Sequence, residues 1–187
     1  MIYETIISTV DGAGTPHITP FGVRKIDDFL LISPFRPSTT LENILATKVA
    51  VMNLTDDVRV FAGAVVKSLP LCDLEPATKV TGFRLKNTLA HQELELVAIR
   101  EDEVRPELQM RVVHQATHQP FMGFNRAQAA VIELAVLVSR LHMLSKNKVM
   151  LEKQYLQIAI DKTAGERELQ AWGWLIEKID HFYRENN

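Results

Sequence analysis

The stretch FLLISPFRPSTTLEN (residues 29–43) decides how this chain is interpreted. Its first four residues are apolar and typical of a strand, and its last residues begin the apolar spacing of a helix. Thr39 and Glu42 stand at the spacing of a capping box. In a capping box the Thr39 side chain accepts from the amide of the third helical residue, and the Glu42 side chain reaches back to the amide of Thr39. The stretch therefore predicts a strand that leads directly into a capped helix.

The junction between this strand and this helix also carries the signature of an anion site. Pro37 favours extended backbone at Arg36, so the guanidinium would project beside the helix N-terminus. Free amides and the helix dipole already attract anions there. Three hydroxyl side chains complete the predicted phosphate site: Ser38, Thr39 and Thr40. An ordinary capped helix with a solvated arginine is the alternative that the residues leave open.

Composition limits the class of protein. The chain has 187 residues, of which 47% are hydrophobic and 24% charged, which suits one soluble domain with an appendage or two small domains. A formal charge of -2 gives no basic surplus, so neither nucleic acid nor an anionic membrane is an expected partner. Cys72 has no second cysteine to pair with, no signal peptide is recognisable, and polar residues interrupt the apolar region 129–144. We expect a cytoplasmic protein without a membrane span.

Short apolar and β-branched runs dominate the first two thirds of the chain. Glycines and acidic residues that favour turns separate these runs, and their meander order favours a small barrel over a parallel sheet. Residues 58–66 fit a strand or a helix equally well, and 68–76 are predicted to be a connection. The predicted strands cover residues 3–10, 17–23, 29–35, 49–54, 94–100 and 108–117.

The chain changes to a helical pattern near Gly123. Asn125 can cap a helix over residues 127–144, a second helix is predicted over 149–161, and Thr163 with Glu166 forms a capping box that opens a third. We therefore expect a mainly β domain with α over residues 1–122, followed by a three-helix subdomain over 123–187.

Other chemistry has weaker signals. His114 and His118 would lie about 13 Å apart along a strand, too far to share a metal without a bend, so no metal site is predicted. His17 could donate a proton or be structural, and Cys72 has no base beside it in sequence. Nucleophile-elbow, Walker and dinucleotide motifs are absent, so no catalytic residue is predicted.

At this point the sequence resembles a known superfamily. The matching segments are 19–23 (TPFGV), 33–40 (SPFRPSTT), 43–44 and 51–53, joined by 123–127 and 130–133. Together they resemble the FMN-binding split-barrel superfamily, which includes flavin reductases and pyridoxamine phosphate oxidases. They are most similar to an uncharacterised branch, found in methanogens and methylotrophs, that has a C-terminal helical tail.

The resemblance implies a Greek-key split barrel that forms a homodimer with FMN near the interface. It implies that residues 19–22 line the isoalloxazine ring and that the junction at Arg36 holds the phosphate. Asn43 and Asn53 match polar positions of flavin reductase-like chains, although each could instead cap local backbone. The complete implied set is Thr19, Pro20, Phe21, Gly22, Arg36, Ser38, Thr39, Thr40, Asn43 and Asn53, with Asn125 and Arg126 as a second polar wall.

Two functions are compatible with this resemblance. One is an FMN-dependent oxidoreductase of the flavin reductase type, acting on an unidentified small molecule with an unidentified reductant. The other is a non-catalytic flavin carrier or an accessory binding protein in reduced-pterin one-carbon metabolism. A micromolar ligand needs about 8 kcal/mol, whereas a helix terminus contributes roughly 0.3–2 and a charged hydrogen bond about 1.5–3. Burial of the ring must therefore supply much of the affinity.

Overall fold

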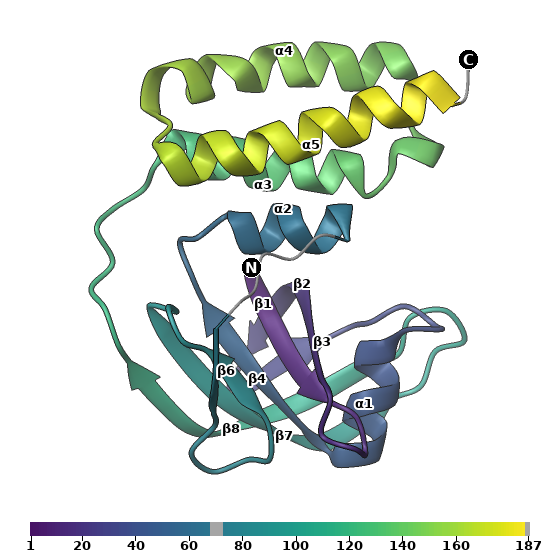
Figure 1. Ribbon diagram of the computed structural model, residues 1–187. Helices are drawn as coiled ribbons and strands as arrows, with labels where there is room; N and C mark the ends of the chain where they lie inside the picture. Colours follow the sequence, from purple (N-terminus) through teal and green to yellow (C-terminus); the bar gives the residue numbers. More distant parts are fainter. Residues whose placement is uncertain (68–72, 186–187) are drawn as a thin grey trace. The chain divides into compact units, whose positions relative to one another are not determined.

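A computed structural model (Figure 1) describes residues 1–67 and 73–185. Cys72 and residues 68–71 of the predicted connection lie outside the described residues, whereas residues 74–76 form a strand instead of continuing the connection. The elements are β1 (Ile2–Val10), β2 (Pro16–Ile26), β3 (Phe29–Ile32), α1 (Thr39–Thr47), β4 (Val49–Leu54), α2 (Arg59–Val66), β5 (Leu74–Pro76), β6 (Phe83–Leu85), β7 (Ala90–Arg100), β8 (Glu107–Thr117), α3 (Arg126–Val138), a 3-10 turn (Leu141–Met143), α4 (Lys146–Thr163) and α5 (Glu166–Glu185).

Six antiparallel strands close into a barrel in the order β1-β2-β3-β8-β7-β4. β1 closes it by pairing with β2 on one side and with β4 on the other, so that Ile6 faces Pro20 in one register and Asn53 in the other. Buried aliphatic side chains fill the interior, among them Ile7, Ile32 and Leu94. Each contributes about 1.5–3 kcal/mol by leaving water. The predicted mainly β barrel with helices is thus confirmed.

Two compact units make up the described chain. The first holds the barrel and α1, in residues 1–55 and 73–121. The second holds α2 and the C-terminal helices, in residues 56–67 and 122–185. The sequence placed residues 58–66 with the barrel and left their structure open between strand and helix. They form α2 instead, because Val58 and Ala62 bury their side chains in one cluster with Leu134 and Leu175.

The N-cap of α1 lies one residue earlier in the chain than the sequence predicts. Ser38, not Thr39, is the N-cap: its backbone is extended, with φ -156° and ψ 142°, and its Oγ accepts from the amide of Leu41 at 3.3 Å. Thr39 already belongs to the helix, so its hydroxyl cannot take the capping position. The predicted Thr39–Glu42 capping box is therefore wrong. The chain does pass from a strand to a helix here, but β3 ends at Ile32 instead of residue 35, so residues 33–38 separate the two elements.

The helical unit differs from its prediction at helix ends. Asn125 caps α3 as predicted, by accepting from the amides of Ala127 and Gln128. However, α3 ends at Val138, so the predicted helix over 127–144 is too long. Thr163 is the last residue of α4, and the carboxylate of Glu168 accepts from the amide ahead of α5, so the second predicted capping box is also wrong. None of the described helices has the length and apolar content needed to span a bilayer.

Candidate functional site

Arg36 lies in the junction between β3 and α1. Its amide donates to the carbonyl of Val104 at 2.8 Å, which ties the junction to the turn between β7 and β8. Its guanidinium reaches the same turn, where Nη2 lies 2.7 Å from the carboxylate of Glu101 and Nε donates to the carbonyl of Asp102. Glu101 is 70% exposed, so an incoming anion could compete with it for Arg36 at small cost.

The N-terminus of α1, which follows Arg36 in the chain, offers further donors. Among the described residues, the amides of Thr39 and Thr40 have no hydrogen-bond acceptor, as expected for the first turn of a helix. Ser38 uses its oxygen as a cap, which leaves its hydroxyl hydrogen free to donate. Free amides, a hydroxyl and a guanidinium in one short segment form a suitable site for a phosphate group.

A second arginine that the sequence analysis missed lies on the same turn. The Nε of Arg105 donates to the carbonyl of Ser33 at 2.8 Å, and its guanidinium lies 4.9 Å from the centre of the Phe35 ring. Asp102 shapes this turn by accepting from the amides of Arg105 and Val104, and these hydrogen bonds lower the pKa of Asp102. No sequence signal identified Arg105, because the contact depends on how β3 pairs with β8.

The four residues that the resemblance assigns to the isoalloxazine ring are consecutive in β2. Thr19, Pro20, Phe21 and Gly22 are all half-buried and pair with β1. Phe21 packs against the barrel core, and its carbonyl accepts from the hydroxyl of Thr5. A Cβ on Gly22 would lie 2.9 Å from Cγ2 of the Ile2 side chain, so a larger residue there would require Ile2 to move. This paired, half-buried segment is therefore partly open to solvent.

The two predicted asparagines of the barrel are engaged with protein atoms. Asn43 is buried and donates to the hydroxyl of Thr9 at 3.0 Å. Asn53 is fully buried; its amide nitrogen donates to the carbonyl of Ile6 and to Ser8, while its oxygen accepts from the amide of Leu85. These bonds favour the structural alternative that the sequence left open, in which Asn53 joins β1, β4 and β6.

Asn125 and Arg126 belong to the helical unit. Besides capping α3, Asn125 donates to the carbonyl of Thr163 at 3.0 Å, so all of its side-chain groups serve the helices. Arg126 is exposed on the first turn of α3. Their proposed role as a polar wall for a ligand of the barrel therefore stays a prediction.

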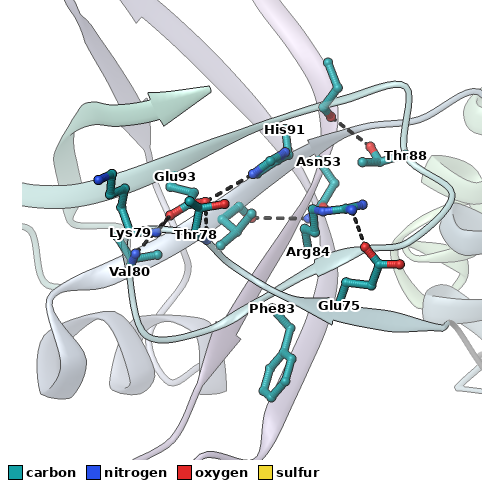
Figure 2. Close-up of polar contacts among 12 residues, drawn as sticks. Asn53, Glu75, Thr78, Lys79, Val80, Phe83, Arg84, Thr88, His91 and Glu93 are labelled. Atoms are coloured by element: carbon teal, nitrogen blue, oxygen red, sulfur yellow. Dashed lines mark hydrogen bonds and ion pairs between the residues drawn. The ribbon is translucent and has the colours of Figure 1, made fainter. Parts of the chain in front are cut away.

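A buried carboxylate forms a second polar centre on β7, which the sequence analysis missed (Figure 2). Glu93 accepts from the amides of Thr78, Lys79 and Val80 at 2.6, 2.6 and 2.9 Å, and its Oε1 lies 3.2 Å from Nε2 of His91. Burial alone would raise the pKa of Glu93, but these hydrogen bonds outweigh it and lower the pKa to about 2.

The strand pair β5–β6 lies next to Glu93 and is held in place by polar contacts (Figure 2). Arg84 of β6 forms an ion pair with Glu75 of β5 and donates to the carbonyl of Leu85. The hydroxyl of Ser8 donates to the carbonyl of Phe83 at 2.6 Å. These bonds hold the segment that carries the three amides bound by Glu93.

The fold defines a class of protein that solved structures share. The chain is similar to the NADH:FAD oxidoreductase of Streptomyces globisporus, with 12% identity, a TM-score of 0.54 and coverage of 63% of this chain and 77% of that one. It is also similar to a candidate flavin reductase with a split barrel domain from Shewanella frigidimarina, with 15% identity, a TM-score of 0.55 and coverage of 67% and 74%. The barrel therefore has the split-barrel fold of these structures.

The chain belongs to the DUF447 family, described as a protein of unknown function. The model of the family's N-terminal domain matches residues 3–119, and the second DUF447 model matches residues 125–177. An FMN-bound protein of this family from Methanosarcina mazei has 21% identity and a TM-score of 0.82, and the alignment covers 95% of this chain and 94% of that one. No curated protein matches the sequence.

Proposed function

We propose that this chain binds FMN and that the β3–α1 junction holds its phosphate. The proposal rests on two observations: the amides of Thr39 and Thr40 at the start of α1 have no acceptor among the described residues, and Arg36, three residues earlier in the chain, pairs with the exposed carboxylate of Glu101. Arg105 adds a second positive charge on the adjoining turn. A doubly charged phosphate group matches this combination of amides and guanidinium groups. The FMN-bound family member, which aligns with nearly the whole chain, supports the same assignment.

The isoalloxazine ring of the flavin needs a surface to pack against, and two features of the barrel unit offer one. The half-buried segment 19–22 of β2 presents backbone. Beside the junction, the apolar side chains of Phe35 and Val104 are 58% and 61% exposed. We propose that flavin and a second copy of the chain cover these surfaces, so that the protein is a homodimer with FMN near the interface.

The proposed activity is that of an FMN-dependent oxidoreductase of the flavin reductase type. Bound flavin supplies hydride or electron transfer, so the protein itself needs to bind, orient and shield the ring. The names of the structural relatives, which include an NADH:FAD oxidoreductase, support this class over a carrier. The proposed substrate is a small molecule whose identity the proposal does not specify.

The first experiment asks whether the chain binds FMN at all. The protein is purified, any yellow chromophore is released and identified, and the flavin-free chain is titrated with FMN while its melting temperature and its molar mass in solution are measured. Saturable binding by a dimer is expected. A colourless monomer that FMN does not stabilise would contradict the proposal.

A second experiment separates the enzyme from the carrier. The FMN-loaded protein is mixed with NADH or NADPH and with several electron acceptors, and oxidation of the nucleotide is followed. Turnover is expected for the oxidoreductase. Tight FMN binding without turnover under any of these conditions would favour the carrier.

Arg36→Ala tests the phosphate site itself. Loss of a charged hydrogen bond worth about 1.5–3 kcal/mol should weaken FMN binding roughly ten- to a hundredfold, measured by fluorescence titration. Arg111→Ala is the matched control, because Arg111 is also a barrel arginine paired with an exposed glutamate. Equal affinities of the two variants would remove Arg36 from the site.

A further inference from the structure

Three imidazoles gather around one point of the β7–β8 ladder, and none belongs to the proposed flavin site. In this ladder His91 pairs with Ala116, so His114 and His118, each two residues from Ala116, are diagonal neighbours of His91 on the same face. The ring of His91 stacks on that of His118, with ring centres 5.1 Å apart. The 13 Å that separates positions 114 and 118 along the strand is bridged by His91 from the partner strand.

His91 lies between two polar groups. Its Nε2 is 3.2 Å from Oε1 of Glu93, and its Nδ1 is 2.9 Å from Nε2 of His118. Its ring centre is 5.7 Å from that of His114. Within the described part of the chain, the ring nitrogens of His114 make no hydrogen bond, so a lone pair is available there. His91 and Glu93 are 2% and 0% exposed, whereas His114 is half-buried and can be reached from solvent.

Glu93 has the properties of an oriented anionic ligand. Its two oxygens are fixed by the amides of Thr78, Lys79 and Val80, in the way that hydrogen bonds fix the carboxylates of metal sites. Oε1 has one amide partner, so its other lone-pair direction now points to His91. A cation placed between Oε1 and His91 would replace one hydrogen bond and leave all three amide bonds intact.

We propose that His91, Glu93 and His114 bind one divalent transition-metal ion, and that zinc suits this donor set best. Candidate ligand atoms of the three residues lie within 4.8 Å of one another. Zinc bonds of about 2.0–2.2 Å place neighbouring ligand atoms roughly 3.3 Å apart, so a small rotation of the half-buried His114 completes the site. Two histidines and one carboxylate leave a fourth tetrahedral position for water or another ligand.

His118 has a separate role in this arrangement. When Nε2 of His91 binds the metal, its hydrogen resides on Nδ1 and is donated to Nε2 of His118, 2.9 Å away. Metal-bound histidines commonly donate their second ring N–H to an acceptor, which fixes the ring and the tautomer, and Nε2 of His118 is the acceptor placed for this role. His118 is therefore a positioning residue rather than a ligand.

The test is zinc binding to the whole protein after treatment with a chelator, measured by calorimetric titration and by metal analysis of the dialysed sample. One zinc ion per chain is expected. His114→Ala should weaken binding more than a hundredfold, and His118→Ala should weaken it roughly ten- to a hundredfold. His17→Ala, which removes a half-buried imidazole from β2 of the same barrel, is the matched control and should bind like the parent chain.

Two results would overturn the proposal. One is the absence of saturable zinc binding by a parent chain whose circular dichroism spectrum is that of a folded protein. The other is equal zinc affinity of the parent chain and a folded His114→Ala variant. Because the readout is zinc alone, loss of the proposed FMN binding would leave this test unaffected.

Discussion

At the scale of single residues, Glu93 has the most strongly perturbed environment that can be tested by pH. Its pKa of about 2 in the folded chain lies below the ordinary value of 4.5. The unfolded chain therefore takes up the proton first as the pH falls. Stabilisation by the carboxylate is complete above about pH 4.5 and is lost as the pH falls towards 2. The two pKa values differ by about 2.5, which corresponds to roughly 3 kcal/mol of folding stability at neutral pH.

Glu93→Gln should consequently lower the free energy of unfolding by about 3 kcal/mol at pH 7, and by progressively less between pH 4.5 and pH 2. Urea denaturation at several pH values, in the presence of a chelator, measures this difference. Glu95→Gln is the control, because Glu95 is an exposed carboxylate two residues along the same strand. A stability difference that does not change with pH would show that the charge of Glu93 is not what holds residues 78–80.

At the scale of elements, the start of α1 separates two possible caps. Ser38→Ala removes the acceptor for the amide of Leu41 and should cost about 1 kcal/mol of stability. Thr39→Ala, its direct neighbour, should cost little, because Thr39 already lies in the helix. The urea midpoint of each variant measures the difference. If Thr39→Ala proved the more destabilising change, the capping box inferred from sequence would be right after all.

The same junction shows how far sequence patterns reach. Short apolar and β-branched runs separated by turn residues predicted the barrel strands, and the apolar run 29–32 followed by helix-capping residues predicted a strand-to-helix junction. Three consecutive hydroxyl residues, Ser38, Thr39 and Thr40, can each cap a helix, so only backbone dihedrals identify the cap. Residues 58–66 were ambiguous because a short apolar run with β-branched residues fits either structure; burial against α3 and α5 resolves it.

The polar cluster on β7 and β8 was out of reach of the sequence for a different reason. His91, Glu93 and His114 meet because of cross-strand register, and a bulge between positions 93 and 94 shifts that register. Spacing along a single strand cannot reveal such a pairing. The predicted asparagines show the converse, since a sequence match to a polar position does not tell whether Asn53 faces a ligand or, as found, satisfies buried backbone.

At the scale of the whole molecule, the order of segments along the chain makes the two units interdependent. α2 lies between β4 and β5 in sequence, but its side chains pack with the C-terminal helices. A chain that ends at residue 122 keeps every barrel strand, yet it leaves Val58 and Ala62 without their apolar partners. The sequence-based division at 122 therefore does not separate two independent cores, although it matches the change from strands to helices.

The shortened chain, residues 1–122, should consequently bind a dye specific for exposed apolar surface and should self-associate, because an uncovered apolar helix face is an association site. Its matched control carries Val58→Lys and Ala62→Glu in the same shortened chain, which makes the uncovered face of α2 polar. The control should stay monodisperse if the barrel folds without the helices. Size-exclusion chromatography with light scattering compares the two. Aggregation of both chains would mean that the barrel itself depends on the helical unit; solubility of both would mean that α2 needs no cover.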